Sequence, residues 1–141
     1  MEVTAFQLAR RRTNKNKPNT EARIAKQGVG FNPSNIYFTV NYDCQNTDVE
    51  IRGIVPKGIY WSLVAYDKYT MPLNSYLFDK TIKKDEEDRY IAYLTTKPKG
   101  RSNEIDVSAS PKGLVLIRSS LPENPDRVVK AVPQVRSIPQ N

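Results

Sequence analysis

The sequence offers few of the side chains that most enzymes use for catalysis. It contains no histidine, which is the commonest general base and the usual partner of a nucleophilic serine or cysteine. Its single cysteine, Cys44, follows Asp43 in a polar stretch, and a neighbouring carboxylate disfavours the reactive thiolate. One cysteine also cannot form a structural zinc site. We therefore predict no catalytic residues, no metal ligands and no cofactor, and we expect that the protein is not an enzyme.

Aromatic and carboxylate side chains form the remaining candidate for a ligand site. Tyrosines gather in the sequence around the single tryptophan, and Asp67 follows Tyr66 directly. A pocket lined by Trp61, Tyr66, Asp67 and Tyr76 would bind a small molecule or support hydrolase-like acid–base chemistry. The alternative, which we favour, is that these rings pack in the core or at strand ends and perform no chemistry.

The net charge of +7 is concentrated at the N-terminus, because residues 1–35 hold seven basic and two acidic residues. Such an arm suits an acidic protein face, nucleic acid or an anionic membrane surface. No aromatic residue lies between Arg10 and Lys26, so base stacking by the arm is not supported and a protein partner is favoured. The candidate partner-binding residues are Phe6, Leu8, Arg10, Arg11, Arg12, Lys15 and Lys17.

The middle of the chain has the alternating pattern of β-strands. Apolar and polar residues alternate over residues 36–41, and residues 59–66 form the most strand-like run. Further strands are expected near residues 49–55, 90–95, 103–107 and 114–118. We predict a mainly β fold: a small antiparallel β-sandwich or curled sheet over residues 36–120. An extended basic arm (1–35) precedes it, and an extended proline-rich tail (121–141) follows, because four prolines disfavour helix there.

The run YWSLVAYD, residues 60–67, resembles the domain-of-unknown-function family 1214. Residues 71–76 (MPLNSY), Asn103 and the stretch from Ala109 to Arg118 continue the resemblance, which covers about residues 36–125. The chain departs from the family pattern at Glu104, where a tryptophan is usual, and after Arg118, where two serines replace an aromatic ending. The resemblance implies a β-sandwich-like domain of a bacterial type that is often fused to a companion domain. It implies no catalytic residues.

These features together favour a non-catalytic accessory subunit that docks its β domain on a large assembly through its termini. Candidate hosts are a photosynthetic membrane complex, on its cytosolic or stromal face, and a ribosome. The alternatives are a small-molecule-binding or hydrolase-like domain, and a nucleic-acid-binding or ribosome-associated protein that acts through the arm. No apolar run is long enough to span a bilayer. We therefore expect a location in the cytoplasm or an organelle stroma, with peripheral membrane contact as a further option.

Overall fold

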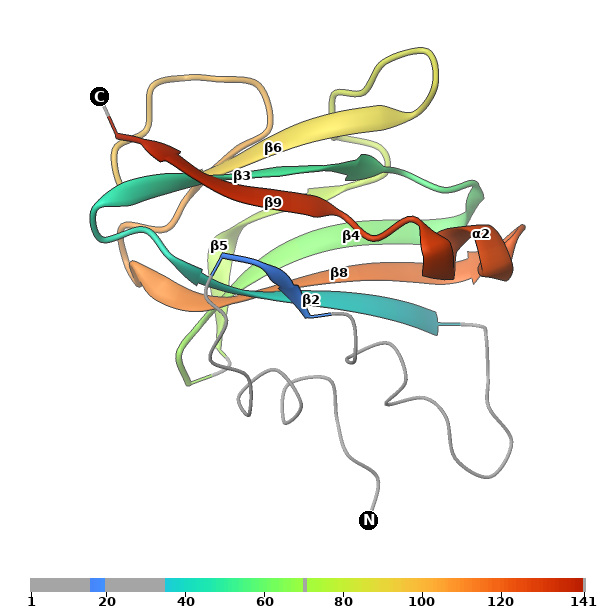
Figure 1. The fold of residues 1–141 in the computed structure, drawn as a ribbon, viewed down its shortest axis with the longest axis horizontal. Coiled ribbons are helices and arrows are strands. Elements are labelled where there is room, and N and C mark those ends of the chain that lie inside the picture. Colours follow the sequence, from blue (N-terminus) through green and yellow to red (C-terminus); the bar gives the residue numbers. More distant parts are fainter. Residues whose placement is uncertain (1–15, 20–34, 70, 141) are drawn as a thin grey trace.

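Two β-sheets packed face to face form most of the described part of the chain (Figure 1). The computed structural model describes residues 16–19, 35–69 and 71–140. The predicted fold class is confirmed: the protein is mainly β, and its two sheets form a small sandwich that does not close into a barrel. The first sheet has the strand order β1-β2-β8-β4-β5 and the second the order β7-β6-β3-β9.

The five-stranded sheet is antiparallel throughout, with β8 at its centre between β2 and β4. Every second side chain of these strands faces the second sheet, and Phe38, Leu63 and Val115 are among the buried ones. Its strands are β1 (Pro18–Asn19), β2 (Asn35–Asp43), β4 (Gly58–Asp67), β5 (Pro72–Phe78) and β8 (Lys112–Pro122).

The four-stranded sheet supplies the other half of the core. Val49, Ile51 and Leu94 are fully buried on its inner face. The pairing of β6 with β7 is parallel, whereas β3 pairs antiparallel with both β6 and β9. Its strands are β3 (Thr47–Ile54), β6 (Arg89–Thr95), β7 (Glu104–Asp106) and β9 (Gln134–Pro139).

The arm and the tail contribute more to the sandwich than the sequence predicts. Within the arm, β1 pairs with the edge of β2. The tail, predicted as extended, instead contains the helix α2 (Pro125–Lys130), in which Asn124 caps the first turn and Val128 is buried. The tail then forms β9, which pairs with β3 along the edge of the sheet (Figure 1). Much of the tail is therefore part of the domain.

No helix among the described residues has the length and apolar character needed to cross a bilayer.

Candidate functional site

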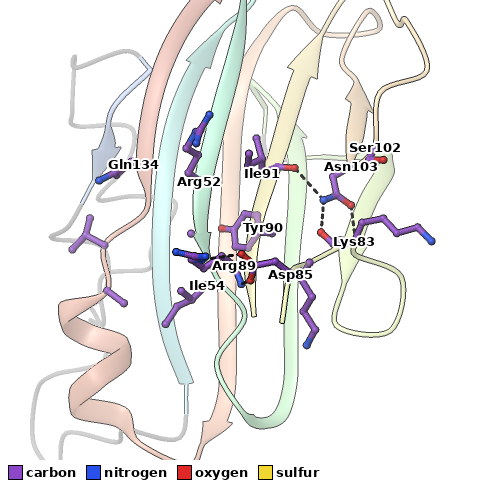
Figure 2. A pocket seen from close by; sticks show the side chains of 14 residues that line it. Arg52, Ile54, Lys83, Asp85, Arg89, Tyr90, Ile91, Ser102, Asn103 and Gln134 are labelled. Atoms are coloured by element: carbon purple, nitrogen blue, oxygen red, sulfur yellow. Dashed lines mark hydrogen bonds and ion pairs between the residues drawn. The ribbon is translucent and has the colours of Figure 1, made fainter. Parts of the chain in front are cut away.

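A groove of about 840 Å³ lies over the four-stranded sheet, close to the C-terminal end of α2 (Figure 2). This volume lies in the range typical of ligand sites. The lining comes from five segments: β3, the start of β6, residues 83–85, residues 102–103 and residues 131–134. Two strands therefore form the floor of the groove, and connecting segments form its walls.

Arginine and isoleucine alternate in a two-by-two block on the floor. In the register of β3 and β6, Arg52 lies opposite Ile91 and Ile54 lies opposite Arg89. Because Ile51 is fully buried in the core, alternation along the strand directs Arg52 and Ile54 to the outer face. We call Arg52, Ile54, Arg89 and Ile91 the groove floor. It presents two guanidinium groups on one diagonal and two apolar side chains on the other.

Asn103 fixes one wall of the groove to the floor, as the dashed lines in Figure 2 show. Its side-chain Nδ2 donates hydrogen bonds to the carbonyl oxygens of Lys83 (2.7 Å) and Ile91 (3.0 Å). Its Oδ1 accepts a bond of 2.8 Å from the backbone N–H of Lys83. Asn103 has a φ of 56°, in the left-handed region that asparagine tolerates better than most residues. This amide therefore holds the 83–85 segment beside β6.

Cations outnumber carboxylates on the lining. Part of this charge is compensated: the Nε of Arg89 is 2.8 Å from Asp85 Oδ2, and Lys84 Nζ is 3.1 Å from an oxygen of Asp88. Each of these side chains is still at least one-third exposed, so a ligand can reach it. The charged side chains that line the groove are Arg52, Lys83, Lys84, Arg89 and Asp85.

Glu50 orients the guanidinium group of Arg52. One carboxylate oxygen of Glu50 accepts from Arg52 Nε (2.7 Å) and from Arg136 Nε (2.9 Å), and its other oxygen accepts from Arg136 Nη2 (3.2 Å). The hydrogen bonds from Arg136 are the main cause that holds the pKa of Glu50 below its ordinary value of 4.5, so the group stays ionised at neutral pH. Two guanidinium groups share this one carboxylate, which leaves a net positive charge beside the groove.

Tyr90 connects the groove to the core. Its ring lies 5.0 Å, centroid to centroid, from the ring of Trp61 at an interplanar angle of 56°. Opposite it on β3 is Gly53, where a Cβ atom would lie only 2.8 Å from the Tyr90 hydroxyl. Glycine at this position therefore lets the tyrosine ring pack closely against β3. Burial raises the pKa of Tyr90, so its hydroxyl remains protonated.

A second polar network lies on the outer face of the same sheet. Arg101 Nη2 donates to Asp48 Oδ2 (2.7 Å), and its Nε donates to Glu104 Oε2 (2.9 Å). Its guanidinium carbon lies 4.4 Å from the centroid of the Tyr93 ring. Gln140 adds a bond of 3.1 Å to the other oxygen of Asp48, which has no exposed surface. Arg101 therefore compensates two carboxylates that the fold has removed from water, which is a structural role.

The structure does not bring Trp61, Tyr66, Asp67 and Tyr76 into one pocket. Trp61 is 1% exposed and packs in the core against Tyr90. Tyr66 lies on the opposite face of β4 by alternation, and Tyr76 is 56% exposed on β5. Asp67 accepts two backbone hydrogen bonds from the turn that follows it. The lining of the large groove includes none of the four.

The candidate partner-binding residues of the arm lie almost entirely outside the described residues. Lys17 is described, and its side chain is exposed immediately before β1. The others, Phe6, Leu8, Arg10, Arg11, Arg12 and Lys15, are outside the described ranges.

The groove floor was not predicted from the sequence, although the sequence contains a signal for it. The tripeptides at 52–54 (RGI) and 89–91 (RYI) share the pattern arginine, any residue, isoleucine. Antiparallel pairing of two such tripeptides produces the alternating block, but only in the one register that aligns them. The pair Lys83–Lys84 was visible in the sequence, but nothing there placed it beside β6.

The Cys44 thiol and the clustered carboxylates are the remaining candidates for chemistry. Burial is the main cause that raises the pKa of the Cys44 thiol to about 12, and the charges of Asp48 and Asp43 add to it. This thiol is therefore a poor nucleophile at neutral pH. In the described ranges, no cluster of three or more histidine, cysteine, aspartate or glutamate side chains is suitable for a metal ion.

Comparison with known proteins supports the fold alone. No protein-family profile and no curated protein matches the chain. Among solved structures, an uncharacterised protein from Burkholderia cenocepacia superposes with a TM-score of 0.67 and 15% identity, over 86% of this chain and 34% of its own. The VPA0106 protein of Vibrio parahaemolyticus superposes with a TM-score of 0.57 and 18% identity, over 77% of this chain and 32% of its own. The chain thus has the fold of a segment in these two proteins and spans about one-third of their length.

Proposed function

We propose that this chain is a non-catalytic accessory module that docks on a larger protein assembly, and that the groove holds an acidic segment of the host. The observation that carries this proposal is the composition of the lining, which combines four cationic side chains and one carboxylate with apolar side chains. Charge complementarity of this kind selects partners and accelerates their association.

The apolar part of the floor favours a protein partner over a nucleic acid. Binding of single-stranded nucleic acid relies on exposed aromatic rings on which bases stack. The aromatic ring of the lining belongs to Tyr90, which is buried and packs against Trp61, so it offers no free face. Ile54 and Ile91 instead provide surface for the aliphatic carbons of peptide side chains.

The site rests on paired strands, which suits binding better than a catalytic cycle. Asn103 and Glu50 hold the wall and Arg52 in place through the hydrogen bonds described above. A groove that is already formed loses little conformational entropy when a partner binds, which favours affinity. The lining contains no cysteine and a single carboxylate, Asp85, so it offers neither a thiol nucleophile nor a pair of carboxylates for acid–base catalysis.

Charge reversal at the groove tests the proposal. We expect a rhodamine-labelled decapeptide of glutamate and leucine to bind the full chain, and Lys83→Glu/Lys84→Glu to weaken binding at least about tenfold, because two attractive charges become repulsive. The measurement is fluorescence anisotropy at low and at physiological salt. The matched control is Lys97→Glu/Lys112→Glu, which changes the net charge equally at two exposed lysines outside the lining.

Three results would overturn the proposal. The first is an absence of peptide binding, and the second is an equal loss in both double variants, which would mean that only the net charge matters. The third is tighter binding of a ten-nucleotide single strand that Lys83→Glu/Lys84→Glu abolishes, which would assign the groove to nucleic acid.

A further inference from the structure

The diagonal of the groove floor has a spacing that an extended peptide can match. Arg52 and Arg89 lie on neighbouring antiparallel strands, each opposite an isoleucine. Diagonal neighbours of this kind are about 7–8 Å apart. In an extended peptide, side chains on the same side are two residues, or roughly 6.6–6.8 Å, apart. The positions at which the two arginine side chains leave the sheet are therefore spaced like alternate residues of an extended chain.

Both guanidinium groups combine a fixed orientation with access to solvent. Arg52 uses its Nε for Glu50, and its side chain is 49% exposed. Arg89 uses its Nε for Asp85, and its side chain is 60% exposed. Within the described residues, Arg52 makes its hydrogen bond and ion pair through Nε, and the terminal Nη2 of Arg89 has one long ion pair of 3.6 Å, to Glu87. The terminal N–H groups can thus meet a carboxylate from outside.

We infer that the host segment binds the groove in an extended conformation, with acidic residues at positions i and i+2 whose carboxylates contact Arg52 and Arg89. This inference rests on the proposed function and specifies the partner of the same site. The aliphatic carbons of the two acidic side chains cover Ile54 and Ile91, which occupy the other diagonal (Figure 2). Lys83 and Lys84 add attraction at the wall without selecting the spacing, because each is a flexible point charge.

The spacing of acidic residues can be varied while the composition stays constant. The probes are three labelled peptides of glycine, threonine and two glutamates. The two glutamates are at positions i and i+1 in the adjacent peptide, at i and i+2 in the alternate peptide, and at i and i+3 in the third peptide. We expect the alternate peptide to bind the full chain at least about fivefold more tightly than the other two, because it alone places both carboxylates on one side at the right distance. The protein is unchanged in this comparison, so folding does not affect the outcome.

Single arginine variants complete the test. Arg52→Gln and Arg89→Gln should each reduce the affinity for the alternate peptide to that for the adjacent peptide, which removes the preference. Arg127→Gln, at an exposed residue of α2 outside the lining, should leave the preference intact. Equal binding of all three peptides, with continued sensitivity to Lys83→Glu/Lys84→Glu, would overturn this inference and leave the proposed function standing. Failure of every peptide to bind would overturn both.

Discussion

Replacing Trp61 with alanine is expected to lower the free energy of unfolding by about 3–5 kcal/mol, the usual cost of truncating a large buried aromatic side chain. Trp61 is among the largest fully buried side chains and packs against Tyr90 between the two sheets. The substitution removes this contact and leaves a cavity. Urea denaturation followed by circular dichroism measures the change, and Trp61→Phe should recover part of the loss.

Tyr60 provides the matched control for this prediction. It precedes Trp61 on β4, points to the opposite face and is 40% exposed. Tyr60→Ala should lower the free energy of unfolding by less than about 1 kcal/mol, because half-exposed surface side chains contribute little to stability. If Trp61→Ala were as mild as Tyr60→Ala, Trp61 would not be a core residue. The ligand pocket around Trp61, the less favoured alternative from the sequence, would then gain support.

Arg101→Ala is expected to lower the free energy of unfolding by about 3 kcal/mol, which is the second large effect. This value is the lower end of the cost of leaving buried carboxylates without their cation. Arg101 is the shared ion-pair partner of Asp48 and Glu104, whose side chains are 0% and 8% exposed. Asp48 keeps its bond from Gln140, which limits the loss. Lys99→Ala removes an exposed lysine two residues away and should change stability by less than about 0.5 kcal/mol.

The cost of Arg101→Ala should depend on pH. Burial raises the pKa of Asp48, but hydrogen bonds from Thr95, Arg101 and Gln140 outweigh it, so this pKa lies below its ordinary value of 3.8. For Glu104 too, burial is opposed by Arg101 and two backbone N–H groups, and its pKa lies below 4.5. Lowered carboxylate pKa values stabilise the fold above the ordinary values, and this stabilisation is lost as the pH falls through the lowered ones.

The difference in unfolding free energy between the wild type and Arg101→Ala should therefore be largest near pH 6–7. It should shrink as the pH falls below the ordinary carboxylate values of 3.8 and 4.5. A difference that stays constant to low pH would show that Arg101 acts through packing on Tyr93 instead of through its charge. Urea denaturation at several pH values distinguishes these results.

The fold was predictable because burial of one face imposes a period of two on each strand. In β2, the buried Phe38 and Val40 alternate with Tyr37, Thr39 and Asn41. Of these three, Tyr37 and Asn41 are only partly buried, whereas Thr39 is buried as well. The tail was harder to predict, because four prolines disfavour helix in general. Pro125, however, occupies the first turn of α2, where its missing N–H has no cost, and Asn124 supplies the cap. The position of Pro125 in the first helical turn therefore allows the tail to form α2 despite its four prolines.

The site could not be predicted in the same way. Its floor depends on which residues of β3 face which residues of β6, and sequence alternation does not determine that register. Its wall depends on hydrogen bonds between Asn103 and Lys83, which are 20 positions apart in the chain. The aromatic pocket, the less favoured alternative from the sequence, is not formed for a related reason: side chains of one strand alternate between its two faces, which separates Trp61 from Tyr66.

Mapping the bound peptide by nuclear magnetic resonance tests the central claim most directly. Adding the alternate-glutamate peptide to the full chain labelled with ¹⁵N should shift the backbone amides of residues 52–54, 83–85, 89–91 and 102–103, which surround the groove. The amide signals of residues at the centre of β8, in the other sheet, should not shift. Shifts confined to the five-stranded sheet, or spread evenly over exposed lysines, would contradict the assignment of the groove as the docking site.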